Sequence, residues 1–426
     1  MPSHLHLPPS TGARMTTRAW DIVLFGATGF TGALVAEYLA RHAPADVRLA
    51  LAGRNRGKLE AVKRGLPDGG VRFGLLLGDS GDPASMRAIA EQTRVLCTTV
   101  GPYAKYGLPV VEACARAGTH YCDLTGEPQF MRRAIDLADA IAQASGARLV
   151  HTCGFDSIPS DLGLLTLHEF MKAQGASGQF KRVTLAVTAM KGGFSGGTVA
   201  SLLNGIEEAT ADRAVRRLMG DPYALSPDRA KEPDLGRQRD LASVRHDDFL
   251  GTWTAPFVMA GVNTRVVRRT NALLGYAYGR ELDYREVTAL RGGVKGLVFG
   301  TAMAAGMGAL VASQLFRPTK KLVQRLLPSP GEGPDQAARD AGFFRFRIEG
   351  ETLEGQRVHA KVVGTADPGY GETAKMLSHA ALCLAQDEAK LPKRAGVLTP
   401  ATAMGMTLVE RLRGAGMTFD AFATAR

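Results

Sequence analysis

The glycine turn at residues 26–32 constrains the fold of this chain more than any other feature. Four apolar residues run into the pattern Gly26-x-x-Gly29-x-x-Gly32, and a segment with helical periodicity follows. Glycine lets such a turn form without a Cβ clash and lets a pyrophosphate approach the backbone, while the helix dipole favours negative charge. The pattern predicts an α/β fold with a Rossmann-type parallel sheet that binds a dinucleotide; a turn used only for packing is the alternative. The expected contacts are Gly26, Thr28, Gly29, Phe30 and Gly32.

The end of the second predicted strand, residues 49–52, indicates which dinucleotide is bound. An NAD-preferring site usually places a carboxylate here for the ribose 2′-hydroxyl, but the sequence continues as GRNRGK. Arg54, with Arg56 or Lys58 nearby, can pair with the 2′-phosphate of NADP, and Asn55 is a further expected cofactor contact. Asp79 follows the next strand and would lie beside the adenine ring, or would serve only as a cap. We therefore predict NADP as the cofactor, with a solvated basic loop as the alternative.

Polar residues at later strand ends are candidates for chemistry, because the reactive ring of the cofactor should lie at the carboxyl edge of a parallel sheet. Gly101 is expected beside the cofactor, and a tyrosine hydroxyl can donate a proton or orient a carbonyl. Tyrosines at loop corners also serve as packing residues, so that alternative stays open. No acid or base is assigned among the four candidates, which are Tyr103, Tyr106, Asp123 and Asp156.

The absence of a Tyr-x-x-x-Lys pattern and the spacing of the cysteines limit the classes of protein to which this chain can belong. No tyrosine is followed four residues later by lysine, which argues against the short-chain dehydrogenases. The five cysteines include no Cys-x-x-Cys pair, which indicates reduced thiols and a cytoplasmic protein. We expect no metal site.

The length of 426 residues predicts more than one domain. We expect a disordered lead-in over 1–19, the NADP-binding domain over 20–160, and a second α/β (α+β) domain over 161–366. The helices of residues 367–426 are expected, by analogy with other two-domain dehydrogenases, to pack back on the first domain.

Two features of the second domain point towards a ligand. A glycine loop over 191–198 precedes a helix predicted to reach about Met219; this loop would hold an anionic or carbonyl group, or act as a hinge. The polar segment 221–248 is expected to form a surface excursion. His379, on an otherwise apolar face, is expected to be a core residue.

The charge pattern suggests partners for the surface. The net charge of +11 favours anionic partners, although no nucleic-acid-binding signature is present, so we exclude nucleic acid. Residues 296–316 are uncharged and are followed by basic residues; they would span a membrane, touch its surface or form a buried helix. The basic and apolar segment KKLVQRLLP favours contact with anionic lipid and peripheral attachment to the plasma membrane. A homodimer is left open.

An ordered set of motifs resembles one known family. GATGFTG, AGRN, VGPYAKYG, THYCDLTGE and GFDSIPSDLG, followed by KGGFSGGTVAS, LPSPGEGP, DPGYGETAKML and GVLTPATAMG, are similar to the saccharopine dehydrogenase-like oxidoreductases, especially the trans-acting enoyl reductases. The resemblance implies an NADP-binding Rossmann domain, a second α/β domain and reduction of double bonds in envelope glycolipid intermediates. The resemblance assigns a cofactor-binding role to four residues only: Gly26, Gly29, Gly32 and Arg54.

The resulting hypothesis is an NADP-dependent oxidoreductase that reduces a C=C or C=O/C=N bond in a lipid-like or acyl substrate. One alternative is an amino-acid imine reductase of the saccharopine dehydrogenase type, which would need several arginines around the cleft. The other is a membrane-associated protein that binds NADP without catalysis.

Overall fold

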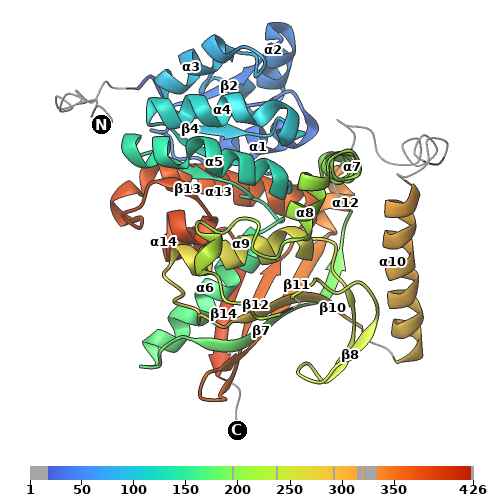
Figure 1. The fold of residues 1–426 in the computed structure, drawn as a ribbon. Helices are drawn as coiled ribbons and strands as arrows, with labels where there is room; N and C mark the ends of the chain where they lie inside the picture. Colours follow the sequence, from blue (N-terminus) through green and yellow to red (C-terminus); the bar gives the residue numbers. More distant parts are fainter. Residues whose placement is uncertain are drawn as a thin grey trace.

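The computed structural model describes residues 18–193, 196–236, 238–290, 293–313, 319 and 333–423. Residues 1–17 of the expected lead-in, the first six residues of the LPSPGEGP motif and most of the basic segment after residue 316 lie outside these ranges. Two seven-stranded sheets organise the described part of the chain, with helices between and around them (Figure 1).

The first sheet is parallel throughout and has the order β13-β6-β5-β4-β1-β2-β3. Its central strands are apolar runs that are buried on both faces, as expected of a parallel sheet covered by helices. The predicted Rossmann-type sheet is thus confirmed. The strands are β1 (Trp20–Phe25), β2 (Leu49–Gly53), β3 (Phe73–Leu77), β4 (Thr93–Thr98), β5 (His120–Asp123), β6 (Arg148–Val150) and β13 (Gly396–Leu398).

The helices that join these strands begin where the sequence offers a cap. Asn55 accepts a hydrogen bond from Lys58 N at the start of one helix, and Asp82 accepts one from Ala84 N at the start of the next. The helix expected from residue 108 begins five residues earlier, because Glu127 accepts hydrogen bonds from the N–H groups of Tyr103 and Ala104. The helices are α1 (Phe30–His42), α2 (Arg56–Gly65), α3 (Pro83–Gln92), α4 (Tyr103–Ala117) and α5 (Pro128–Ser145).

The second sheet is mixed, with the order β14-β12-β11-β7-β10-β9-β8. Only β7 and β10 run parallel; the other described pairs are antiparallel. The sequence predicted the hairpin of β11 and β12 and most of β7, but not the remaining strands. The strands are β7 (Phe180–Lys191), β8 (Arg245–Asp247), β9 (Thr252–Pro256), β10 (Asp283–Ala289), β11 (Phe343–Thr352), β12 (Arg357–Gly364) and β14 (Thr418–Ala423).

The C-terminal segment belongs to both sheets. Helix α13 (Thr373–Gln386) packs on α1, β4 and β5, and β13 extends the first sheet beside β6. Strand β14 then pairs with β12 in the second sheet. Between the sheets, α6 (Ile158–Ala173), α9 (Ala260–Leu273) and α14 (Pro400–Gly414) pack on one another (Figure 1).

Two helices differ from the sequence predictions. The helix expected to run to Met219 is divided into α7 (Gly196–Ala211) and α8 (Arg213–Gly220), because Asp212 leaves the helix and caps α8 through Ala214 N. Helix α10 (Val294–Ser313) is not the closely packed buried helix that was one alternative, since it stands at the side of the molecule (Figure 1). Val298 and Phe299 are 62% and 63% exposed.

Helix α10 contacts β9 of the second sheet, and a Cβ on Gly300 would lie 2.4 Å from a methyl carbon of Leu290, the residue after β10. Among the described residues, no helix combines the length and the apolar character that crossing a bilayer requires. The membrane-spanning alternative therefore receives no support from the described helices.

The buried carboxylate of Asp161 offers a test of the packing between the sheets. Its Oδ1 accepts a hydrogen bond from Thr270 Oγ1 of α9, and its Oδ2 accepts one of 2.8 Å from Ala401 N of α14. Asp161→Ala should cost about 2–4 kcal/mol of stability, because both buried donors lose their acceptor. Urea unfolding should show a lower midpoint. Asp46→Ala, at an exposed position, is the control, and equal midpoints for the two variants would contradict this account.

Candidate functional site

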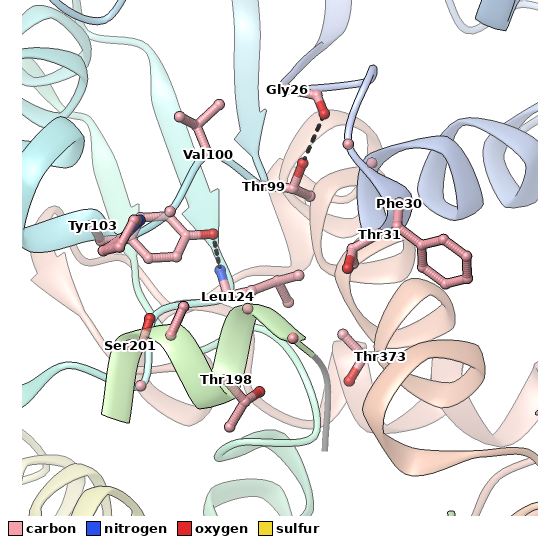
Figure 2. A pocket seen from close by; sticks show the side chains of 18 of the residues that line it. Gly26, Phe30, Thr31, Thr99, Val100, Tyr103, Leu124, Thr198, Ser201 and Thr373 are labelled. Carbon is pink, nitrogen blue, oxygen red and sulfur yellow. Dashed lines mark hydrogen bonds between the residues drawn. The ribbon is translucent and has the colours of Figure 1, made fainter. Parts of the chain in front are cut away.

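A cavity of about 620 Å³ lies at the carboxyl edge of the first sheet. Its walls come from the turn after β1, the ends of β2 and β4, helix α7, the start of α9 and the turn at residues 368–370. In Figure 2 the turn of Gly26 and Phe30 faces Ser201 and Thr198 of α7 across this space. Both sheets therefore contribute to one site.

The glycine turn has the geometry that a pyrophosphate site needs. Gly26 has a φ of +93°, and a Cβ there would lie 2.7 Å from a methyl carbon of Val100. A Cβ on Gly32 would lie 2.2 Å from the carbonyl oxygen of Gly26. Helix α1 has no side-chain cap at Gly29, so the N–H groups of its first turn are available to an anion. All five residues predicted to contact the dinucleotide in this turn line the cavity.

The predicted cofactor residues beyond this turn divide into two groups. Arg54, Asp79 and Gly101 line the cavity. Asp79 also shapes its own turn, because Oδ1 accepts a 2.9 Å hydrogen bond from Gly81 N. Asn55 does not line the cavity, since its side chain is used to cap α2.

The two tyrosines lie in the first turn of α4 rather than in a loop, and both line the cavity. The Tyr103 hydroxyl donates to Thr98 O at 3.1 Å. It also accepts from Leu124 N at 3.2 Å (Figure 2). Burial raises the pKa of Tyr103 well above its usual value. Its hydroxyl therefore fixes the wall of the site, whereas Tyr106 is 44% exposed.

Asp123 is a buried structural hub and not a residue of the cavity wall. It accepts hydrogen bonds from the Tyr121 hydroxyl at 2.8 Å and from the N–H groups of Thr125 and Thr152. His151 Nδ1 lies 2.7 Å from its Oδ2. These contacts hold the ends of β5 and β6 together, and the expectation that Asp123 faces a substrate is not met.

Asp156 does face the cavity, from the loop between β6 and α6. Burial, and then the negative charge of Asp123, raise the pKa of Asp156 to about 7. Among the described residues none donates a hydrogen bond to this carboxyl group. Asp156 is therefore an acid that holds its proton near neutral pH in contact with the cavity.

The sequence did not predict that Glu127 connects α7 to the start of α4 beside the cavity. Ser201 Oγ donates to Glu127 Oε1 at 2.7 Å, which joins α7 to the start of α4. The only signal was a carboxylate at the end of a predicted strand. Gly192 and Gly193 before α7, and Gly196 and Gly197 at its start, line the cavity. Gly196 N donates to the Tyr370 hydroxyl and Gly193 N donates to Asp367 Oδ1.

His379 lies outside the cavity. Its Nε2 lies 3.0 Å from the Tyr38 hydroxyl, and burial lowers the pKa of His379 to about 4. It is a partly buried packing residue between α1 and α13.

The cavity has a polar end and an apolar end. Arg54 and Asp79 lie at the end beside β2 and β3, and Arg54 is the only basic side chain among the described lining residues. The lining on the side of β5, β6 and the second domain is mainly apolar, although it also includes Asp156, Thr198 and Ser201. Its apolar side chains are Leu124, Phe155, Met190, Leu202, Val258, Met259 and Val262. A molecule that fills both ends must combine an anionic part with an apolar part.

A family model for the NADP-binding domain of saccharopine dehydrogenase matches residues 22–150. The chain is 46% identical over 412 residues to a Mycobacterium tuberculosis protein provisionally named a trans-acting enoyl reductase, covering 95% of this chain and 98% of that protein. It is 41% identical over 412 residues to a trans-acting enoyl reductase of Mycobacterium bovis, covering 94% and 97%. The chain belongs to the saccharopine dehydrogenase-like family of trans-acting enoyl reductases. It is thus an oxidoreductase with an NAD(P)-binding domain, as the sequence predicted.

The solved structures include one of similar overall fold. Apo saccharopine dehydrogenase (L-Glu forming) from Saccharomyces cerevisiae superposes with a TM-score of 0.54 at 12% identity. The match covers 95% of this chain and 100% of that chain. This likeness confirms the two-domain α/β architecture.

Proposed function

We propose that this family member uses NADPH to reduce the C=C bond of an enoyl group in a lipid-like acyl substrate. The observation that carries the proposal is the apolar end of the cavity, which begins where the cofactor site ends. Apolar walls recognise acyl chains through burial of surface. The names of the mycobacterial relatives favour an enoyl group over a carbonyl or an imine.

The cofactor fits the residues of the polar end. The N–H groups of the first turn of α1 are suited to the pyrophosphate, and the exposed Arg54 to the 2′-phosphate. Rossmann geometry then directs the nicotinamide towards the ends of β4 and β5. NADPH, when bound, supplies the hydride for the reduction.

The protein must deliver a proton to the second carbon of the double bond. Asp156 is suited to this role because its carboxyl group lines the cavity and its pKa is raised to about 7. The apolar neighbours Met259 and Phe155 exclude water from the same wall. We propose Asp156 as the proton donor, with Tyr106 orienting the substrate and Tyr103 and Asp123 supporting the wall.

An amino-acid imine substrate fits this cavity less well. Such a substrate carries carboxylates, which are usually held by arginines. Arg54 is the only described basic residue of the lining, and it lies at the cofactor end. A protein that binds NADP without catalysis also fits this cavity less well. Such a protein needs only the cofactor site, whereas the apolar part of the cavity leaves room for a second ligand.

Arg54→Ala tests the preference for NADPH. The variant should bind NADPH more weakly by about 1–3 kcal/mol, with little change for NADH, because only NADPH carries the 2′-phosphate. Fluorescence titration of both nucleotides measures the effect. Arg56→Ala, two residues later, is the matched control, since Arg56 pairs with Glu60 and does not line the cavity. Equal losses for NADPH and NADH would contradict the assignment.

Asp156→Asn tests the proton donor. The wild-type rate should fall as pH rises through about 7, because the acid is lost when Asp156 ionises. The variant should lose about 10²–10⁴-fold in turnover of an enoyl substrate and should lose this pH dependence. Steady-state rates across pH with an acyl enoyl thioester measure both. Asp46→Asn, at an exposed position outside the cavity, is the control; an unchanged profile in Asp156→Asn would exclude this role.

We also propose that α10 meets an anionic membrane surface. Its exposed apolar residues Val294, Val298 and Phe299 and the net charge of +11 suit such a contact, which would bring a lipid-like substrate to the enzyme.

Flotation with vesicles of anionic phospholipid tests this surface. Val298→Glu should reduce the bound fraction several-fold, because the charge must enter the lipid interface. Val71→Glu is the matched control, since Val71 is 75% exposed on the first domain. Equal binding by the two variants would show that α10 is not the contact.

A further inference from the structure

A second cavity, of about 260 Å³, lies in the second domain between β10, the later part of α9 and the segment 238–245. It shares no lining residue with the nucleotide cavity. Its described lining is mostly polar, in contrast to the acyl end of the first cavity. A different kind of ligand is therefore expected here.

Four arginines line this second cavity: Arg239, Arg245, Arg268 and Arg285. Arg268 is only 7% exposed, and its Nε and Nη1 atoms have no hydrogen-bond partner among the described residues. Its Nη2 donates to the carbonyl oxygen of Tyr284 at 3.0 Å. The Tyr223 ring centroid lies 5.6 Å from Arg268 Cζ, and burial lowers the pKa of Arg268. A buried cation that has no carboxylate partner is stabilised when an anion binds near it.

The carboxylates of the same cavity are already engaged by other groups. Asp240 pairs with Arg265 and accepts from Thr264 Oγ1, and Asp283 lies 2.8 Å from Arg285. Asp240 and Asp283 therefore neutralise Arg265 and Arg285, and these two arginines do not require an anionic ligand.

Glu286 is engaged as well. It accepts hydrogen bonds of 2.8 Å from Asn263 Nδ2 and from the Tyr284 hydroxyl. Burial raises the pKa of Glu286 to about 7, which weakens its negative charge.

The arginines that line the second cavity are not all neutralised by its carboxylates. Within the described part of the chain, no carboxylate forms an ion pair with Arg239, Arg245 or Arg268. Arg239 and Arg245 are exposed at the rim, and Arg268 lies beneath them. Planar guanidinium groups bind phosphate oxygens through pairs of hydrogen bonds, and a doubly charged phosphate balances such a surplus better than a single carboxylate does.

We propose that this cavity is a binding site for a phosphate group, either free or on a small phosphorylated molecule. Arg239 and Arg245 contact the phosphate, and Arg268 supplies positive charge behind it. The site does not depend on the proposed reductase activity, since the two cavities have separate walls.

Calorimetric titration with inorganic phosphate, and separately with glycerol phosphate, tests the proposal at constant ionic strength. The full chain is used, with and without saturating NADPH, so that phosphate binding at the nucleotide cavity is recognised by competition. The wild type should bind a phosphate ligand in both states. Tighter binding of glycerol phosphate would identify a phosphorylated molecule as the ligand, and equal or tighter binding of inorganic phosphate would identify the free ion.

The double variant Arg239→Gln/Arg245→Gln should weaken this binding at least about tenfold, because two charge-assisted contacts are lost. Both residues are exposed, so the fold should persist. Arg213→Gln/Arg217→Gln on α8 is the matched control, with the same change in charge at exposed positions outside the cavity. Equal binding by the two double variants, binding of acetate as tight as phosphate, or no phosphate binding by the wild type would overturn the proposal.

Discussion

The return of the C-terminal segment to the first sheet is the constraint on which the nucleotide cavity depends. Strand β13 pairs with β6, and Val397 N donates to Asp139 Oδ1 at 2.7 Å. From the second domain, Arg269 donates to the carbonyl oxygens of Leu225 and Val397. Thr373 of α13 lines the cavity and accepts a hydrogen bond from Phe155 N. The two sheets are thus held around one space by contacts between residues that are far apart in the sequence.

The chemistry of the site depends on which carboxyl groups near the cavity have hydrogen-bond partners. Two other carboxylates near this space are paired, Asp123 with Tyr121 and Glu127 with Ser201. Asp156 has no such described donor, so burial and the nearby negative charge of Asp123 act on its pKa without compensation. A carboxyl group that faces the cavity and accepts no hydrogen bond from the described residues is available to a substrate.

The sequence predicted the cofactor end of the site well and the catalytic end only partly. The glycine turn and Arg54 are local features, because a strand, a turn and a helix N-terminus are adjacent in the chain. Asp123 and Asp156 looked alike in the sequence, since each follows an apolar strand. Only the folded chain distinguishes them: the hydroxyl of Tyr121 and the N–H of Thr152 donate to Asp123, whereas no donor in the described ranges reaches Asp156.

By itself, the sequence determined the family, the parallel sheet and the nucleotide-binding turn, because these depend on short-range geometry and on motifs in a fixed order. The tertiary structure decided which strand ends meet across the cavity, that α10 is exposed, and that three of the arginines lining the second cavity lack carboxylate partners in the described chain. The physical reason is that burial and pairing are properties of neighbours in space. In this protein many of those neighbours are more than a hundred residues apart, as Thr270 and Asp161 are.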